Sequence, residues 1–252
     1  MLRHLIALSA VLCSAGSLVA GELMVYTASQ GLLSRLYVLD GDGSVVRYHE
    51  YENYILADLE VLDNQVYVVD WVAPAVFRVD LESGELFQTV VDLSWLYLYG
   101  VASDGTYFYV DEWDLSRYTL DGDYDSTASF DEDVMGLAWD GAYLWTLNPA
   151  NQVRCWDISA WPTVTEIAGN AFAPPTPECR GLWFDGQHFW TAESLDGSLG
   201  WIYEFEQGGT VVAQWREPAF RGFAAAGVFD PEPIFSDNFE SGDTSAWSAV
   251  AP

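Results

Sequence analysis

The chain has 252 residues, half of them hydrophobic and 15% aromatic, which is enough to bury the core of one domain without requiring a second. All nine basic residues are arginine, and 38 acidic residues give a formal net charge of −29. This charge argues against binding to nucleic acids or anionic lipids. The absence of lysine excludes lysine Schiff-base chemistry and a P-loop lysine.

The N-terminal segment has the features of a secretory signal peptide. A short basic start, an apolar stretch from Leu5 to Leu12 and small residues before Gly21 predict a signal peptide over residues 1–21. Cys13 follows Leu12 instead of a small residue, which argues against a lipid-modified cysteine. No later stretch stays apolar for about 18 residues, so we expect no membrane span. We therefore expect a secreted monomer in the extracellular space, on the cell surface or in the periplasm.

One pattern then recurs along the chain with a period of about forty residues, which is typical of propeller blades. Each copy has an apolar strand, a tight turn and an aromatic-rich second strand, followed by a third and a fourth strand. The tight turns contain Asp-Gly or Asp-Asn, dipeptides that tolerate the positive φ angles that tight hairpins require. The turns are Asp63-Asn64, Asp104-Gly105, Asp140-Gly141 and Asp185-Gly186.

The repeats predict an all-β, five-bladed β-propeller over residues 22–230. The first unit lacks an inner strand, and the last copy, residues 221–229, is an inner strand without the rest of a blade. We expect this C-terminal strand to complete the N-terminal blade and close the ring, which would remove exposed sheet edges. The predicted blades are residues 23–56, 57–98, 99–134, 135–178 and 179–220.

The repeat Gly136-Leu-Ala-Trp-Asp-Gly141, followed by an aromatic-rich strand, resembles propellers of the NHL, YncE-like and glutaminyl-cyclotransferase-like groups. This resemblance implies a fold and no particular activity. Residues 231–252 differ in composition. The run from Phe239 to Ser248 resembles a short C-terminal motif of secreted bacterial proteins, which implies a sorting tag. The alternative is a disordered polar terminus.

Two cysteines remain after the signal peptide, Cys155 and Cys179. In an oxidising compartment they are a candidate disulfide, and the alternative is two separately buried thiols.

Ligands of propellers bind mainly at the mouth of the central channel, so the loops on that face carry the candidate site residues. Arg180 and Arg221 just before repeat glycines would suit an anion, unless each pairs with a neighbouring carboxylate. The residues at this position of the repeat are Tyr99, Met135, Arg180, Arg221 and, from the degenerate copy that lacks the glycine, Asp58.

Loops between second and third strands reach the same face. Carboxylates beside tryptophans suit sugar or peptide recognition, and Glu112 with Glu193 would offer acid/base chemistry; solvated loop carboxylates are the alternative. The residues are Asp70, Trp71, Asp111, Glu112, Trp113, Asn148 and Glu193.

The opposite face offers a candidate calcium site, the only cofactor that we consider. Asp121, Asp123, Asp125 and Glu132 have the spacing of a calcium loop, although Ser126 replaces the usual glycine and the flanking segments are predicted strands. A solvated hairpin turn explains the same residues without a metal.

These observations favour a secreted, non-enzymatic propeller that binds a small ligand or a partner protein at the channel mouth. A serine-triad motif is absent, and too few histidines remain for a three-histidine zinc site. The alternatives are an enzyme similar to glutaminyl cyclotransferases or propeller lyases, and a structural surface module.

Overall fold

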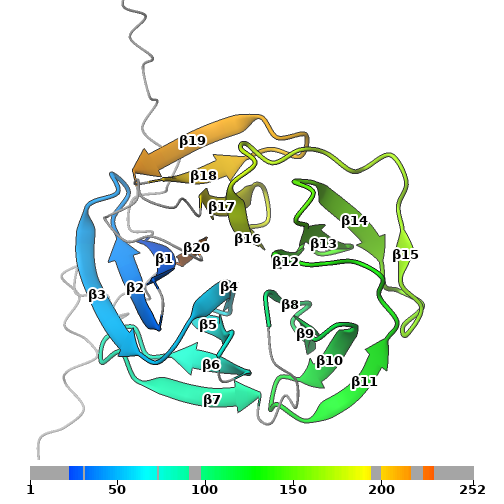
Figure 1. Cartoon of the computed structure of the whole chain (residues 1–252), viewed down its shortest axis with the longest axis horizontal. Coiled ribbons are helices and arrows are strands. Elements are labelled where there is room, and N and C mark those ends of the chain that lie inside the picture. The colour runs from blue at the N-terminus through cyan, green and yellow to red at the C-terminus, as the bar shows by residue number, and fades with distance from the viewer. Residues whose placement is uncertain are drawn as a thin grey trace, which may run out of the picture.

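The computed structural model describes residues 23–30, 32–72, 74–90, 98–193, 200–216 and 224–229. Within these ranges all regular structure is β, in five four-stranded antiparallel sheets placed around a central axis (Figure 1). The predicted five-bladed propeller is therefore confirmed. The described segments include no helix that could cross a membrane.

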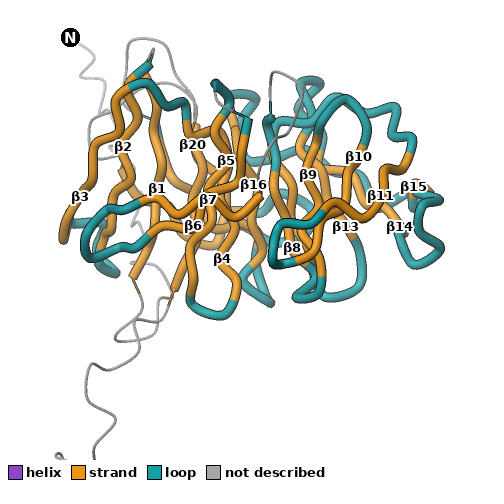
Figure 2. The backbone as a smooth tube through the Cα atoms, turned by 90° about the horizontal axis from the view of Figure 1, so that it is seen from below, coloured by secondary structure: helices purple, strands orange, loops and turns teal. Residues whose placement is uncertain are grey.

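Each blade is a meander that runs from the axis outward, and its turns lie on two opposite faces (Figure 2). From inner to outer strand, blade 1 comprises β20 (Ala224–Phe229), β1 (Leu23–Gln30), β2 (Leu33–Leu39) and β3 (Val45–Glu52), and blade 2 comprises β4 (Leu56–Leu62), β5 (Gln65–Asp70), β6 (Ala75–Val79) and β7 (Leu86–Val90). Blade 3 comprises β8 (Val101–Ser103), β9 (Tyr107–Asp111), β10 (Leu115–Thr119) and β11 (Tyr124–Ala128). Blade 4 comprises β12 (Gly136–Trp139), β13 (Leu144–Leu147), β14 (Val153–Asp157) and β15 (Thr165–Glu166), and blade 5 comprises β16 (Cys179–Phe184), β17 (Phe189–Glu193), β18 (Trp201–Phe205) and β19 (Val211–Arg216).

The ring is closed as predicted, because the C-terminal strand β20 is the inner strand of the N-terminal blade. It pairs antiparallel with β1, with Met24 opposite Val228. Ala226 and Val228 of β20 are buried. A Cβ atom at Gly227 would lie 2.8 Å from Cδ1 of Leu59, so the closing strand also packs tightly on blade 2.

The turn aspartates of the repeat are bonded to the aromatic residues that recur with them. In blade 3, Oδ1 of Asp104 accepts the N–H groups of Thr106 and Tyr107, each at 2.8 Å, and Oδ2 accepts the hydroxyl of Tyr109 at 2.8 Å. Blades 4 and 5 repeat this arrangement, in which Asp140 and Asp185 accept the indole N–H of a tryptophan five residues later. The repeat therefore encodes a hydrogen-bonded turn as well as a hydrophobic pattern.

A single carboxylate connects four of the blades at the axis. Asp58 on β4 is fully buried and accepts backbone N–H groups of the three inner strands β8, β12 and β16. The donors are Val101 at 3.2 Å, Leu137 at 3.0 Å and Leu182 at 3.2 Å. Burial raises the pKa of Asp58 well above its usual range, and these N–H donors oppose the rise.

Glu60 continues this arrangement along β4. Its carboxylate accepts the N–H of Ser103 at 3.0 Å and the indole N–H of Trp183 at 2.9 Å. Burial raises the pKa of Glu60 to about 8. Asp58 and Glu60 therefore satisfy backbone and side-chain donors that the inner strands direct toward the axis.

The repeat glycines allow the inner strands to approach one another. A Cβ atom at Gly136 would lie 2.4 Å from the backbone nitrogen of Leu182 and 2.5 Å from the carbonyl carbon of Gly181. Backbone atoms cannot move aside as a flexible side chain can, so only glycine fits at this contact between blades 4 and 5.

We expect Asp58→Asn to destabilise the protein by ~3 kcal/mol, because the amide would place a donor against buried N–H groups and leave at least one of them unpaired. Urea unfolding measures the change. Asp63→Asn is the control, since Asp63 has φ 48 at the exposed β4–β5 turn, where asparagine is well tolerated. Equal stability of the two variants would contradict the role of Asp58.

Deletion of β20 should abolish the cooperative thermal transition, because blade 1 would lose its inner strand and expose the edge of β1. A synthetic peptide of residues 221–230 should restore the transition when it is added to the truncated chain. An unchanged melting temperature after the deletion would show that the ring does not depend on this closure.

Candidate functional site

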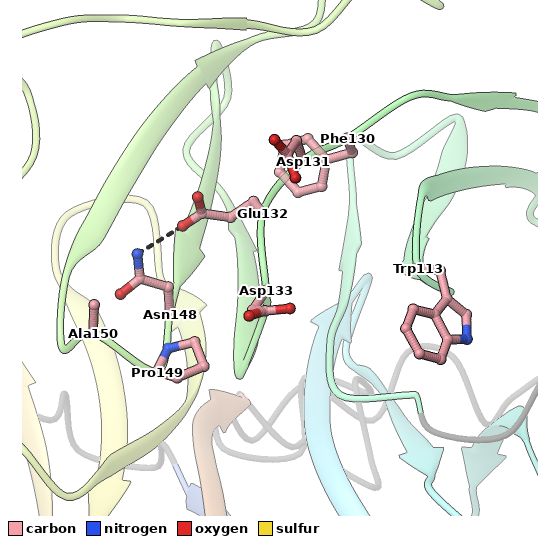
Figure 3. A pocket seen from close by; sticks show the side chains of 8 residues that line it. All are labelled: Trp113, Phe130, Asp131, Glu132, Asp133, Asn148, Pro149 and Ala150. Carbon is pink, nitrogen blue, oxygen red and sulfur yellow. Dashed lines mark hydrogen bonds between the residues drawn. The ribbon is translucent and has the colours of Figure 1, made fainter.

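A pocket of about 600 Å³ lies between blades 3 and 4. Its walls come from the β9–β10 loop, the β11–β12 connection and the β13–β14 loop, which all reach the same face of the propeller (Figure 3). This is the face on which the sequence analysis places the channel mouth. The lining residues are Trp113, Phe130, Asp131, Glu132, Asp133, Asn148, Pro149 and Ala150.

Trp113 is held in a conformation that tryptophan rarely adopts. It lies between Glu112 and Asp114 in the short loop joining β9 to β10, where the N–H of Glu112 donates to the carbonyl of Asp114 at 3.0 Å. Its φ is 84° and its side chain is 77% exposed. A non-glycine residue in this region is strained, and such strain is concentrated at functional sites. An exposed indole held in this way is a candidate contact surface for a ligand.

The wall opposite Trp113 is fixed by a polar network. Nδ2 of Asn148 donates to Oε1 of Glu132 at 2.7 Å, as the dashed line in Figure 3 shows. Oδ1 of Asn148 accepts the N–H of Gln152 at 3.0 Å. Arg154 pairs with both Glu132 and Glu166. The charge of Glu132 is therefore compensated, and the network connects the β11–β12 and β13–β14 loops.

Asp111 ends β9, two residues before the pocket-lining Trp113. Alternate residues of a strand face the same side, so Asp111 shares the side of Tyr109. Tyr109 stacks on Trp139 of blade 4, with 6.5 Å between ring centroids. Asp111 therefore points into the seam between blades 3 and 4, where it is only 6% exposed.

The carboxyl of Asp111 accepts no hydrogen bond from the residues described. Burial and the negative charges of Asp133, Glu112 and Asp114 raise its pKa to about 8. An acid in this environment exchanges its proton near neutral pH.

The position of Asp111 in the repeat is occupied differently in the other blades. It lies seven residues after the turn aspartate of blade 3, and the corresponding positions in blades 4 and 5 are Leu147 and Ala192. Both are buried apolar residues. Blade 2 has Asp70 at this position, and its Oδ1 accepts the N–H groups of Ile55 and Val72. Asp111 differs from Asp70 because it accepts no hydrogen bond from the described residues.

The predicted acid/base pair is not brought together. Glu112 accepts the hydroxyl of Tyr118 at 2.8 Å, and burial raises its pKa. Glu193 accepts the hydroxyl of Tyr203 at 3.0 Å. Each carboxylate is bonded within its own blade, and blade 4 separates blades 3 and 5.

Arg180 is half-buried and donates to the carbonyl of Cys179 at 2.6 Å. It forms no ion pair with a carboxylate in the described part of the chain, and burial lowers the pKa of its guanidinium. Arg221 lies outside the described residues.

The other predicted mouth residues have varied environments. Asp58 lies within the channel, where its carboxylate accepts backbone N–H groups of three inner strands. Oδ1 of Asp70 is also structural, because it accepts the N–H groups of Ile55 and Val72. Trp71 and Tyr99 are half-buried, with 6.3 Å between ring centroids.

The structure does not bring together the four carboxylates of the predicted calcium loop. Asp121 and Asp123 are exposed at the β10–β11 turn, and Asp125 on β11 pairs with Arg117 at 2.7 Å. Glu132 lies beyond the other end of β11, in the pocket described above. The sequence spacing fits a compact loop, but an extended strand separates these residues.

The predicted disulfide is absent, and the alternative of two buried thiols holds. Cys155 on β14 and Cys179 on β16 are both free and buried within one hydrophobic cluster. Burial raises the pKa of the Cys155 thiol to about 11 and also raises that of Cys179.

Trp113, Asn148 and Glu132 were candidates in the sequence, and Glu132 was a candidate as part of the predicted calcium loop. The sequence analysis missed Phe130, Asp131, Asp133 and the loop residues Pro149 and Ala150. The run of three acidic residues just before an inner strand was the signal that could have identified the first part of this wall.

Comparison with known proteins shows the fold and no closer relationship. No protein-family model and no curated protein sequence matches the chain. Among solved structures, TolB from Acinetobacter baumannii is 12% identical with a TM-score of 0.56, covering 82% of this chain and 66% of that one. Glutaminyl cyclase from Myxococcus xanthus is 15% identical with a TM-score of 0.54, covering 64% and 70%. A chain of the nidogen/laminin complex is 10% identical with a TM-score of 0.50, covering 83% and 98%.

Asp111 should make stability depend on pH. The pKa of Asp111 is about 8 in the folded state, which exceeds its value in the unfolded chain. At pH values between these two pKa values the folded state binds more protons than the unfolded state does, so the free energy of unfolding falls as the pH rises toward 8. We expect Asp111→Asn to gain about 4 kcal/mol relative to the wild type between pH 5 and pH 9, since three pH units at about 1.4 kcal/mol each lie between pH 5 and the pKa of Asp111. Urea unfolding at both pH values measures the difference. Asp131→Asn, which removes an exposed charge from the same pocket, is the control, and an equal gain there would contradict the assignment.

Proposed function

We propose that this protein is an exported, non-enzymatic binding propeller that holds a small ligand in the pocket between blades 3 and 4. The observation that carries the proposal is Trp113, which is 77% exposed at φ 84 on the rim of a 600 Å³ pocket. A cavity of this size is in the range of small-molecule sites. The predicted signal peptide over residues 1–21 supports export.

The fixed wall of the pocket favours binding. Asn148 and Arg154 both bond to Glu132, so this wall is organised before a ligand arrives. Preorganised polar groups reduce the cost of binding. Trp113 and Asp133 supply the side of the pocket that remains free to contact a ligand.

One observation favours an enzyme as the second candidate. Asp111 has a pKa of about 8 and lies near Asp133, and a carboxyl of this kind suits general acid/base catalysis. A binding protein returns its ligand unchanged, whereas an enzyme converts it. Mass spectrometry of each ligand after overnight incubation with the protein separates the two functions.

Trp113→Gly is the variant that tests the site. We expect it to stabilise the fold by ~1 kcal/mol, because glycine adopts φ 84 without strain and little packing is lost. Stabilisation of the wild type by ligands should be lost in the same variant. A thermal-shift screen against sugars, amino acids, carboxylates and organic ammonium ions measures both effects.

Tyr124→Gly is the matched control, since it removes an exposed aromatic side chain on the outer strand β11. Ligand stabilisation should survive in this variant. If every stabilising ligand acts equally on the wild type and on Trp113→Gly, the pocket is not the binding site.

A further inference from the structure

The pocket and its rim carry an excess of negative charge. Among the described residues, the only cation bonded to a pocket-lining carboxylate is Arg154, and it is shared by Glu132 and Glu166. An anionic ligand would meet uncompensated repulsion here, and a cation would be attracted. The carboxylates of the pocket and its rim are Asp111, Glu112, Asp114, Asp131, Glu132 and Asp133.

Some of these carboxylates already have partners. Glu132 is bonded to Arg154 and Asn148, and Glu112 accepts the hydroxyl of Tyr118. Asp114 accepts the N–H of Phe130 at 2.9 Å.

Three other carboxylates, those of Asp111, Asp131 and Asp133, accept no hydrogen bond from the described residues. Asp111 differs from the other two because it is only 6% exposed, and it points into the seam beside the pocket. An ionised acid with so little exposure and no hydrogen bond from the described residues is costly, and a cation that reached it would offset part of that cost.

The geometry favours an organic cation over a metal ion. Metal ligation requires several ligand atoms close together, and the pocket carboxylates do not form such a group. In the described ranges, the group that does is Asp185, His188 and Glu204 near the β16–β17 turn, on the opposite face. Both carboxylate oxygens of Asp185 already accept N–H groups of this turn and its second strand. The position of Asp185 is therefore accounted for by the hydrogen bonds of the turn.

Aromatic and apolar surfaces complete the pocket. Trp113 presents an exposed indole, and the face of an indole attracts cations more strongly than other aromatic side chains do. Pro149 and Ala150 form an apolar part of the opposite wall, as Figure 3 shows. In that view Asp133 lies between this loop and Trp113. An alkyl-substituted cation would match all three kinds of surface.

We infer that the ligand carries a substituted ammonium group, which binds between the Trp113 indole and the carboxylates of Asp111 and Asp133. This inference rests on the proposed function and names its ligand class. The indole contributes a cation–π contact, the carboxylates contribute charge, and the apolar wall contacts the alkyl substituents.

Binding of such a cation should release a proton. The charged groups acting on Asp111 are Asp133 from the β11–β12 connection and Glu112 and Asp114 from the β9–β10 loop. All three favour the protonated form of Asp111, and a bound cation favours the ionised form. With a pKa of about 8, Asp111 gives up its proton when the cation binds, so affinity should rise between pH 6 and pH 9.

Isothermal titration of the full chain with choline tests the inference, because choline keeps its charge at every pH. Its neutral isostere, 3,3-dimethylbutan-1-ol, has the same shape without the charge. We expect saturable binding of choline and none of the isostere. Asp133→Asn should weaken choline binding about tenfold, and Asp111→Asn should also remove its pH dependence. Asp123→Asn is the control, since it removes one exposed charge from the opposite face.

Several outcomes would overturn the inference: no saturable choline binding at millimolar concentration, equal binding of the neutral isostere, or equal effects of Asp133→Asn and Asp123→Asn. The ligand screen then separates the two proposals. If neutral or anionic ligands depend on Trp113 while choline does not bind, the pocket is a ligand site of another class. If no ligand depends on Trp113, the proposed function fails as well.

Discussion

The hydrogen bonds of Asp58 hold the inner strands of four blades in register around the axis. In a five-bladed ring the inner strands come so close that Gly136 has no room for a Cβ atom. Their N–H groups therefore need an acceptor inside the channel, and Asp58 and Glu60 supply it. Because these buried side chains occupy the interior, the candidate ligand site lies off the axis, in the seam between two blades.

Two residues beside that seam, Asp111 and Trp113, have unfavourable local environments. Asp111 stands where blades 4 and 5 have buried apolar residues and blade 2 has the hydrogen-bonded Asp70, and Trp113 adopts a φ that glycine would adopt without strain. Both features cost stability, one through a buried acid that accepts no hydrogen bond from the described residues and the other through backbone strain. Both occur within three residues, at the edge of the same pocket. A ligand that contacts both residues would recover part of that cost, which is the physical reason to regard them as one site.

The sequence predicted the fold because each blade repeats a local structure that can be recognised without tertiary information. The turn aspartate, the glycine and the aromatic residue five positions later form one hydrogen-bonded unit, and their period gives the number of blades. For the candidate site, the sequence predicted only the face of the propeller on which it lies. Strand alternation places loops on that face, but the seam between two blades depends on packing. The register shift between Leu56 and Asp58 on β4 has no sequence signal, so the burial of Asp58 was not foreseen.

The net charge of −29 raises the local concentration of every cation, so attraction alone does not define a site. Long-range attraction acts through water and is screened over about 8 Å at physiological ionic strength. The contacts in the seam act at shorter range, since Asp111 is buried and Trp113 offers a surface that inorganic ions use less well than alkylated ones do. The net negative charge therefore affects the association rate of cations in general, whereas the contacts in the seam would determine which cation binds specifically. The two contributions differ in their dependence on salt, because only the first is removed by screening.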